Sequence, residues 1–148
     1  MALVLIDTNL LIYLYDHNEP AKQTHSRFVL NELQKIGAGR LSVQNLSEFA
    51  NIALKKISPV ITASDVVEQI RLFANVFPVH TVTPPMVADA VRAVKEHQLP
   101  FYDAQMWSCA RFNQIPIIFS EDFQDGQVLE GVRFVNPFAE TFQLEKWI

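Results

Sequence analysis

Short apolar runs alternate along the chain with longer segments of helical periodicity. The first run, residues 3–6, is apolar throughout and suits a strand that is covered on both faces. Further strands are predicted at residues 40–43, 79–82, 115–120 and 132–135. The helical segments, in which apolar residues recur every three or four positions, are residues 21–36, 44–57, 63–77, 84–97 and 101–112. This alternation predicts an α/β protein: a central, mainly parallel sheet of about five strands between two layers of helices.

Local signals agree with these boundaries. Thr83 followed by Pro84 is typical of a helix start, with an N-cap and then proline in the first turn. Gly37 and Gly39 lie where a helix should end and a strand begin. The tail, residues 136–148, carries several aromatic residues, and we expect it to pack on its own domain or at a dimer contact.

Composition is that of one globular domain. The chain has 148 residues, of which 49% are hydrophobic and 19% charged, and we interpret residues 1–148 as a single domain. The one cysteine, Cys109, excludes an intrachain disulfide. The apolar start is too short for a signal peptide and no run is long enough for a membrane span, so a cytoplasmic protein without membrane contact is expected.

The net charge of the chain argues against a simple nucleic-acid binder. The formal charge is −4, whereas simple nucleic-acid binders usually present a basic face. Any function that involves nucleic acid must therefore explain the acidic residues.

Four acidic residues occupy positions that a parallel sheet brings together. Asp7 directly follows the first predicted strand, and Asp122 follows the strand that ends near Ser120. Glu48 lies early in the helix after the second strand, and Asp103 opens the helix that follows Pro100. Functional residues of such sheets gather beyond the carboxyl ends of the strands, so we expect the four carboxylates to lie close together.

Each acid also has a purely structural interpretation. Asp7 is a suitable N-cap for a helix that begins at the next residues. Glu48 follows Asn45 at the spacing of a capping box, and Asp103 complements the positive end of its helix dipole. Asp122 fits a polar turn. The four acids together favour a shared site over four separate structural roles.

A divalent cation would make such a cluster tolerable. Two carboxylates about 4 Å apart repel by roughly 4 kcal/mol at an effective dielectric near 20. Oxygen ligands without histidine or cysteine favour Mg²⁺, with Mn²⁺ as a substitute. Bound ions would also reverse the local charge, which answers the objection raised by the acidic composition. Lys55, Lys56 and Arg111 are candidate phosphate contacts, although a solvated surface role suits the two lysines equally well.

The chain resembles the PIN-domain family, specifically the bacterial VapC-type toxin ribonucleases. The resemblance rests on four motifs in family order: Ile-Asp-Thr-Asn at 6–9, Leu-Ser-Glu-Phe at 46–49, Tyr-Asp-Ala at 102–104 and Ser-Glu-Asp-Phe at 120–123. It extends to Glu-Gly-Val at 130–132 and Asn-Pro-Phe at 136–138. The match therefore covers nearly the whole chain.

The resemblance implies a PIN-like α/β/α sandwich and a metal-dependent endoribonuclease that leaves 3′-hydroxyl and 5′-phosphate ends. It further implies a homodimer, an RNA substrate and a cognate antitoxin that occupies the active-site groove. Thr8, Asn9 and Ser120 match the polar residues that support the acids, with serine at 120 where threonine is commoner. Asp122 is the closest match to the fourth acid, and Glu121 or Asp125 is an alternative for its role.

Rival functions lack part of their signature. A dehalogenase-type phosphatase needs a second aspartate two residues after Asp7, where this chain has Asn9. A receiver domain needs an acidic pair at the first strand. A PIN-like module that binds RNA or protein without cleavage, and a metal-dependent DNA nuclease, remain as alternatives.

Overall fold

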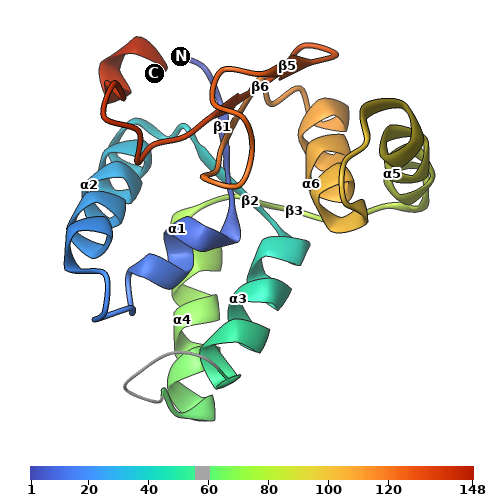
Figure 1. Ribbon diagram of the computed structural model, residues 1–148. Coiled ribbons are helices and arrows are strands. Elements are labelled where there is room, and N and C mark those ends of the chain that lie inside the picture. The colour runs from blue at the N-terminus through green and yellow to red at the C-terminus, as the bar shows by residue number, and fades with distance from the viewer. Residues whose placement is uncertain (56–60) are drawn as a thin grey trace.

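The computed structural model, which describes residues 1–55 and 61–148, contains a six-stranded sheet between two groups of helices (Figure 1). The strands are β1 (Val4–Ile6), β2 (Gly39–Ser42), β3 (Val79–His80), β4 (Ile117–Phe119), β5 (Val128–Leu129) and β6 (Val132–Val135). The helices are α1 (Thr8–Tyr13), α2 (Pro20–Ile36), α3 (Val43–Lys55), α4 (Ala63–Val76), α5 (Pro84–His97), α6 (Phe101–Phe112) and the short 3-10 helix η1 (Leu144–Lys146). The predicted α/β architecture with a mainly parallel sheet is confirmed.

The strand order is β3-β2-β1-β4-β6-β5, and every pair is parallel except β5 with β6. The chain runs outward from β1 in one direction through β2 and in the other through β4. The carboxyl ends of β1 and β4 therefore flank the point at which the topology switches, where α/β proteins place their ligand sites.

The sixth strand is the main departure from the predicted fold. Strand β5 has only two residues and pairs antiparallel with β6 across a turn at Glu130 and Gly131. Both turn residues have positive φ, at 46° and 84°, as a two-residue hairpin requires. So short a strand leaves no readable apolar alternation, which is why the sequence predicted about five strands.

The two faces of the sheet bury separate cores. Val4 and Ile6 point into a core shared with α1, α2, α3 and α4, whereas Leu5 between them points into a core shared with α5 and α6. This alternation follows from the two-residue period of a strand. Figure 1 shows the two helical groups on opposite sides of the sheet. The tail packs on the first core through Phe138, Phe142 and the buried Leu144.

Helix ends follow the predicted signals in part. Gly37 closes α2 in the left-handed region at φ 71°, which a residue with a Cβ rarely adopts. Thr83 is the N-cap of α5 with proline in its first turn, although its side chain makes no capping hydrogen bond. No helix among the described residues is long and apolar enough to cross a membrane.

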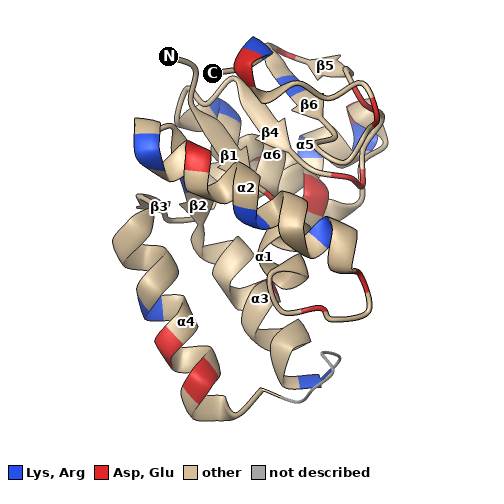
Figure 2. Ribbon diagram, turned by 90° about the vertical axis from the view of Figure 1, so that its left-hand side faces the viewer, with Lys and Arg blue, Asp and Glu red and all other residues tan. Residues whose placement is uncertain are grey.

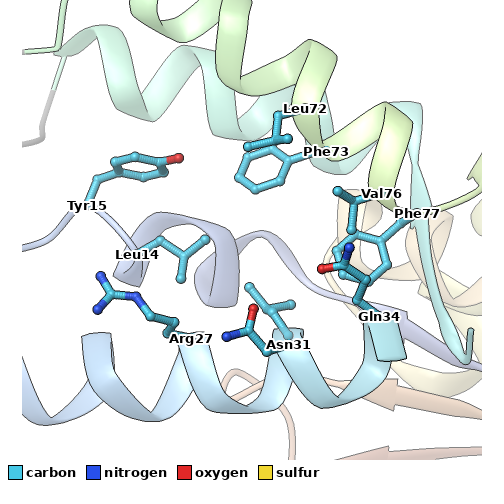
Figure 3. Close-up of a pocket in the computed structure, with 10 residues that line it drawn as sticks. Leu14, Tyr15, Arg27, Asn31, Gln34, Leu72, Phe73, Val76 and Phe77 are labelled. Atoms are coloured by element: carbon cyan, nitrogen blue, oxygen red, sulfur yellow. The ribbon is translucent and has the colours of Figure 1, made fainter. Parts of the chain in front are cut away.

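An apolar groove of about 320 Å³ separates α2 from α4 (Figure 3). Leu72, Phe73 and Val76 of α4 face Leu14 and polar side chains of α2 across it. None of its described lining residues is acidic, so this groove is chemically distinct from the site described next.

Candidate metal centre

Asp7 occupies the junction between β1 and α1. Its Oδ1 accepts a hydrogen bond from the Thr8 amide at 2.7 Å, so the residue does cap α1 as its structural interpretation predicted. Its Oδ2 accepts from the Ser120 hydroxyl at 2.6 Å, which ties the end of β1 to the end of β4. Asp7 is only 5% exposed, yet it lines a cavity. The capping role and the site role therefore coexist in one side chain.

The end of β4 supplies the opposite wall. Ser120 is buried, and its Oγ accepts from the Asp122 amide at 3.1 Å while its hydroxyl donates to Asp7. The Asn9 side-chain amide lies 3.3 Å from Asp122 Oδ2 and 3.4 Å from Ser120 Oγ. Asn9 and Ser120 thus link the two aspartates, in the supporting positions that the resemblance implied.

Glu48 reaches the same cavity from α3 and is held by two donors. Thr8 donates to its Oε2 at 3.3 Å, and Gln44, one turn earlier on α3, donates to its Oε1 at 2.6 Å. Gln44 also donates to the Tyr102 carbonyl and accepts from Gln105, both at 2.8 Å. The sequence analysis missed Gln44 and Gln105, because a polar residue within a helical pattern carries no signal of which partner it meets.

The capping box expected between Asn45 and Glu48 is wrong. Helix α3 begins at Val43, and the reciprocal pair is one turn earlier: Ser42 Oγ accepts from the Asn45 amide at 3.2 Å, and Asn45 Oδ1 accepts from the Ser42 amide at 3.0 Å. Asn45 therefore sits in the first turn and not before it. This shift releases Glu48 from any capping role and leaves its carboxylate to the cavity.

Asp103 completes the group from the first turn of α6. The four predicted acids Asp7, Glu48, Asp103 and Asp122 line one cavity of about 310 Å³. An adjoining cavity of about 480 Å³ shares Glu48 and Asp103 with the first, so the hollow continues along α3 and α6. The structure brings together all four acids, from four separate elements of the chain.

Burial and mutual repulsion disfavour the ionised acids. Burial raises the pKa of Asp7 to about 7, with smaller contributions from the charges of Asp122 and Glu48 and against the hydrogen bonds from Ser120 and Thr8. Burial, with the charges of Asp122 and Glu48, raises the pKa of Asp103 to about 6. Among the described residues, no lysine, arginine or histidine forms an ion pair with any of the four.

The neighbours of Asp122 are engaged elsewhere. Glu121 accepts from Lys22 Nζ at 2.9 Å and from the Tyr13 hydroxyl, and Asp125 accepts from the Asn136 amide at 2.9 Å. Only Asp122 of these three acids is among the described residues that line the cavity.

The residues predicted to contact phosphate differ in where they lie relative to the acidic cavity. Lys55 is exposed at the end of α3, two turns beyond Glu48 on the same helix face, and Lys56 lies outside the described residues. Arg111 lies at the far end of α6 from Asp103 and pairs with Asp89 at 2.8 Å. The structure does not bring Arg111 to the cavity, because Asp89 on the neighbouring helix α5 holds it.

The donor set fits a hydrated divalent cation. No three of the four acids present ligand atoms within 4.8 Å of one another, whereas among the described residues Glu96, His97 and Glu130 do. That second cluster already contains a cation, since Arg92 contacts Glu96 at 2.6 Å and Glu130 at 3.0 Å. Carboxylates that share one cavity and have no basic partner among the described residues suit a divalent cation that keeps several of its waters and needs few protein ligands.

Comparison with known proteins identifies the family. The PIN domain family model matches residues 4–124, so the chain belongs to the PIN domain family. No curated protein matched the sequence.

Solved structures share the fold at low sequence identity. A toxin–antitoxin complex from Klebsiella pneumoniae is 18% identical over 91% of this chain and 98% of that chain, with a TM-score of 0.66. VapC20 of Mycobacterium tuberculosis, described as a toxin that cleaves the sarcin–ricin loop, is 21% identical over 88% and 98%, with a TM-score of 0.65. DNA-bound VapBC from Salmonella typhimurium is 16% identical over 90% and 97%, with a TM-score of 0.64.

Proposed function

We propose that this chain is a divalent-metal-dependent endoribonuclease that hydrolyses RNA phosphodiester bonds to 3′-hydroxyl and 5′-phosphate ends. The observation that carries the proposal is the convergence of Asp7, Glu48, Asp103 and Asp122 on one cavity with no described cation paired to them. Membership of the PIN domain family and the shared fold with VapC-type toxins support it.

The four carboxylates would hold Mg²⁺, with Mn²⁺ as a substitute. The bound ion would supply Lewis-acid chemistry, lowering the pKa of a water nucleophile and neutralising charge on the phosphoryl oxygens. Thr8 and Gln44 fix the orientation of Glu48, and Ser120 and Asn9 fix Asp7 and Asp122. These supporting groups keep the carboxylates in place before any substrate arrives.

Phosphate contacts outside the cavity would come from individual basic residues. In Figure 2, acidic and basic positions are interspersed along α2 and α4, so neither helix is basic along its whole length. We retain Lys55 as a proposed phosphate contact because it shares a helix face with Glu48, and we do not assign that role to Arg111.

We further propose that the protein is the toxin of a VapBC-type pair: a cytoplasmic homodimer inhibited by a cognate antitoxin that covers the acidic groove. Support comes from solved structures with this fold that are described as toxin–antitoxin complexes. A short neighbouring gene that encodes a DNA-binding protein would strengthen this assignment.

The activity is tested by incubating the purified protein with total RNA or single-stranded DNA in Mg²⁺, Mn²⁺ or EDTA, followed by sequencing of new 5′-phosphate ends. The proposal predicts discrete RNA cuts in Mg²⁺ and Mn²⁺ and none in EDTA. RNA cleavage that persists in EDTA, or cleavage of DNA alone, contradicts it.

A further inference from the structure

A separate cavity on the opposite side of Tyr13, called the second cavity below, shares no described lining residue with the acidic one. It has a volume of about 340 Å³ and lies between α2 and the tail, with a wall that includes Lys22, His25, Pro137, Phe138, Glu140 and Phe142. Tyr13, which lines the acidic cavity, packs edge-on against Phe138, with ring centroids 5.2 Å apart. The contact between these two rings therefore joins the walls of the two cavities.

Lys22 stands at the boundary between the cavities. Its ammonium lies 4.9 Å from the centre of the Tyr13 ring and 5.5 Å from that of Phe138. It also donates to Glu121 at 2.9 Å, next in the chain to Asp122. About a third of its side chain, 35%, is exposed. An RNA strand leaving the acidic cavity in this direction would meet the Lys22 ammonium, which is already paired with Glu121.

The wall of the second cavity consists mainly of aromatic and apolar side chains, and Lys22 is the only lysine or arginine among its described lining residues. His25 lies edge-on between Phe138 and Phe142, with centroid distances of 5.6 and 5.7 Å. Glu140, exposed at the cavity wall, repels a phosphate but accepts hydrogen bonds from the amino group of a base. Aromatic side chains beside a cation are how proteins bind unpaired nucleotides, because every base has a face that stacks.

We propose that this second cavity binds one nucleobase of single-stranded RNA beside the cleaved bond, while Lys22 contacts the phosphate between the two cavities. The inference rests on the proposed ribonuclease function and adds to it a base subsite and a positioning cation. The subsite makes cleavage depend on the presence of a base at one fixed distance from the cut.

Abasic scanning tests the base subsite. The probe is the shortest RNA that the wild type cuts at one bond, synthesised with the base removed at each position in turn. In the wild type, one abasic position beside the cut should raise KM about fivefold or more, the order of one stacking contact. In His25→Ala and Phe138→Leu that same position should lose its penalty, while thermal melting shows that both variants are folded.

Lys22 is tested by the salt dependence of KM. Lys22→Ala should raise KM and lower the slope of log KM against log salt by about one, as loss of one phosphate contact does, and Lys22→Arg should restore the slope. The matched control is Lys35→Ala, which removes an exposed lysine at the other end of α2 and should change neither quantity. A purely structural role, holding Glu121, would lower kcat and leave the slope unchanged.

The outcomes separate the two proposals. If the wild type cuts no RNA, the ribonuclease function fails and the subsite fails with it. If the wild type cuts RNA but the abasic penalty persists in both cavity variants, or no position shows a penalty, only the subsite is overturned; the cavity would then be open to a protein partner.

Discussion

At the scale of single residues, Asp7 is an ionisable side chain in a place that disfavours its charged form. Its carboxylate is buried, is close to other acids, and gains only neutral hydrogen-bond donors. Burial raises its pKa to about 7, so near neutral pH the metal-free protein must either keep a proton on this group or bear a buried charge. Such a conflict is typical of a site that is completed by a cation.

Asp7→Asn should therefore stabilise the metal-free protein while abolishing cleavage. Removal of the buried charge at pH 8 should raise the free energy of unfolding by about 1 to 4 kcal/mol, since one pKa unit corresponds to about 1.4 kcal/mol. Loss of a ligand should lower kcat/KM by about 100-fold or more. Urea unfolding in EDTA and a cleavage assay measure the two effects.

Asp125→Asn is the matched control, because it removes one charge from an exposed aspartate outside the described cavity lining. It should leave both quantities near the wild-type values. An Asp7→Asn protein with normal magnesium-dependent cleavage contradicts the assigned role.

The raised pKa values of Asp7 and Asp103 also set a pH dependence. In the unfolded chain both groups have the ordinary aspartate pKa of 3.8, whereas in the folded protein the pKa is about 7 for Asp7 and about 6 for Asp103. Between these limits the folded state binds more protons, so the free energy of unfolding should fall as pH rises from about 4 to about 7. Thermal melts in EDTA across this range measure this change in stability. A melting temperature that rises between pH 6 and pH 7 would contradict the prediction. So would a decrease of the same size in Asp7→Asn, because that variant lacks the titrating group.

At the scale of elements, helix α3 shows how a local signal positions Glu48, a proposed metal ligand. The Ser42 and Asn45 capping pair fixes where α3 begins, and this start places Gln44 and Glu48 one turn apart on the side of α6. Gln44 then connects the two helices that supply Glu48 and Asp103. The geometry of the site thus depends on residues that contact no substrate.

Gln44→Ala should consequently weaken metal binding without removing a ligand. Loss of a group that orients a metal ligand typically costs about 10- to 100-fold in affinity. Calorimetric titration with Mn²⁺ measures it, with Gln34→Ala as a control, since Gln34 is an exposed glutamine on α2 that lines the apolar groove. Equal affinities in wild type and Gln44→Ala would show that Gln44 does not orient Glu48.

The elements themselves were largely predictable from sequence, because their apolar periodicity is strong. The helices 63–77 and 84–97 were predicted close to α4 and α5, and Gly37 marked the end of α2. Strand β5 escaped prediction because two residues cannot show a period. The Asn45 capping partner was misplaced because Ser42 and Asn45 each suit an N-cap, and only the backbone decides between them.

At the scale of the whole molecule, the sheet topology explains why four distant acids could be predicted as a group. Asp7 and Asp122 follow adjacent parallel strands, so their proximity needs only the strand order. Asp122 was predicted as the fourth acid, with Glu121 and Asp125 as alternatives, from the family resemblance alone, because the structural choice depends on Lys22 and Tyr13, which bind Glu121. Similarly, Arg111 is removed from the site by Asp89 on another helix.

The net charge of the whole molecule, although acidic, is compatible with the proposed RNA substrate. The cavity acids carry no described ion-pair partner, and a bound cation would change the sign of the field where the phosphate arrives. Cations such as Lys22 and Lys55 then act locally, at the edges of the site. The overall charge therefore describes the metal-free protein and not the surface that the proposed RNA substrate would meet.

Calorimetric titration of Mn²⁺ into the wild type and Asp103→Asn at pH 7.5 tests the central claim most directly. Burial and two neighbouring acids raise the pKa of Asp103, and among the described residues its side chain makes no hydrogen bond to the other three acids or to the groups that hold them. We expect saturable binding to the wild type and an affinity at least about tenfold lower in Asp103→Asn. Absence of binding to the wild type, or identical isotherms for the two proteins, would contradict a metal centre at these acids.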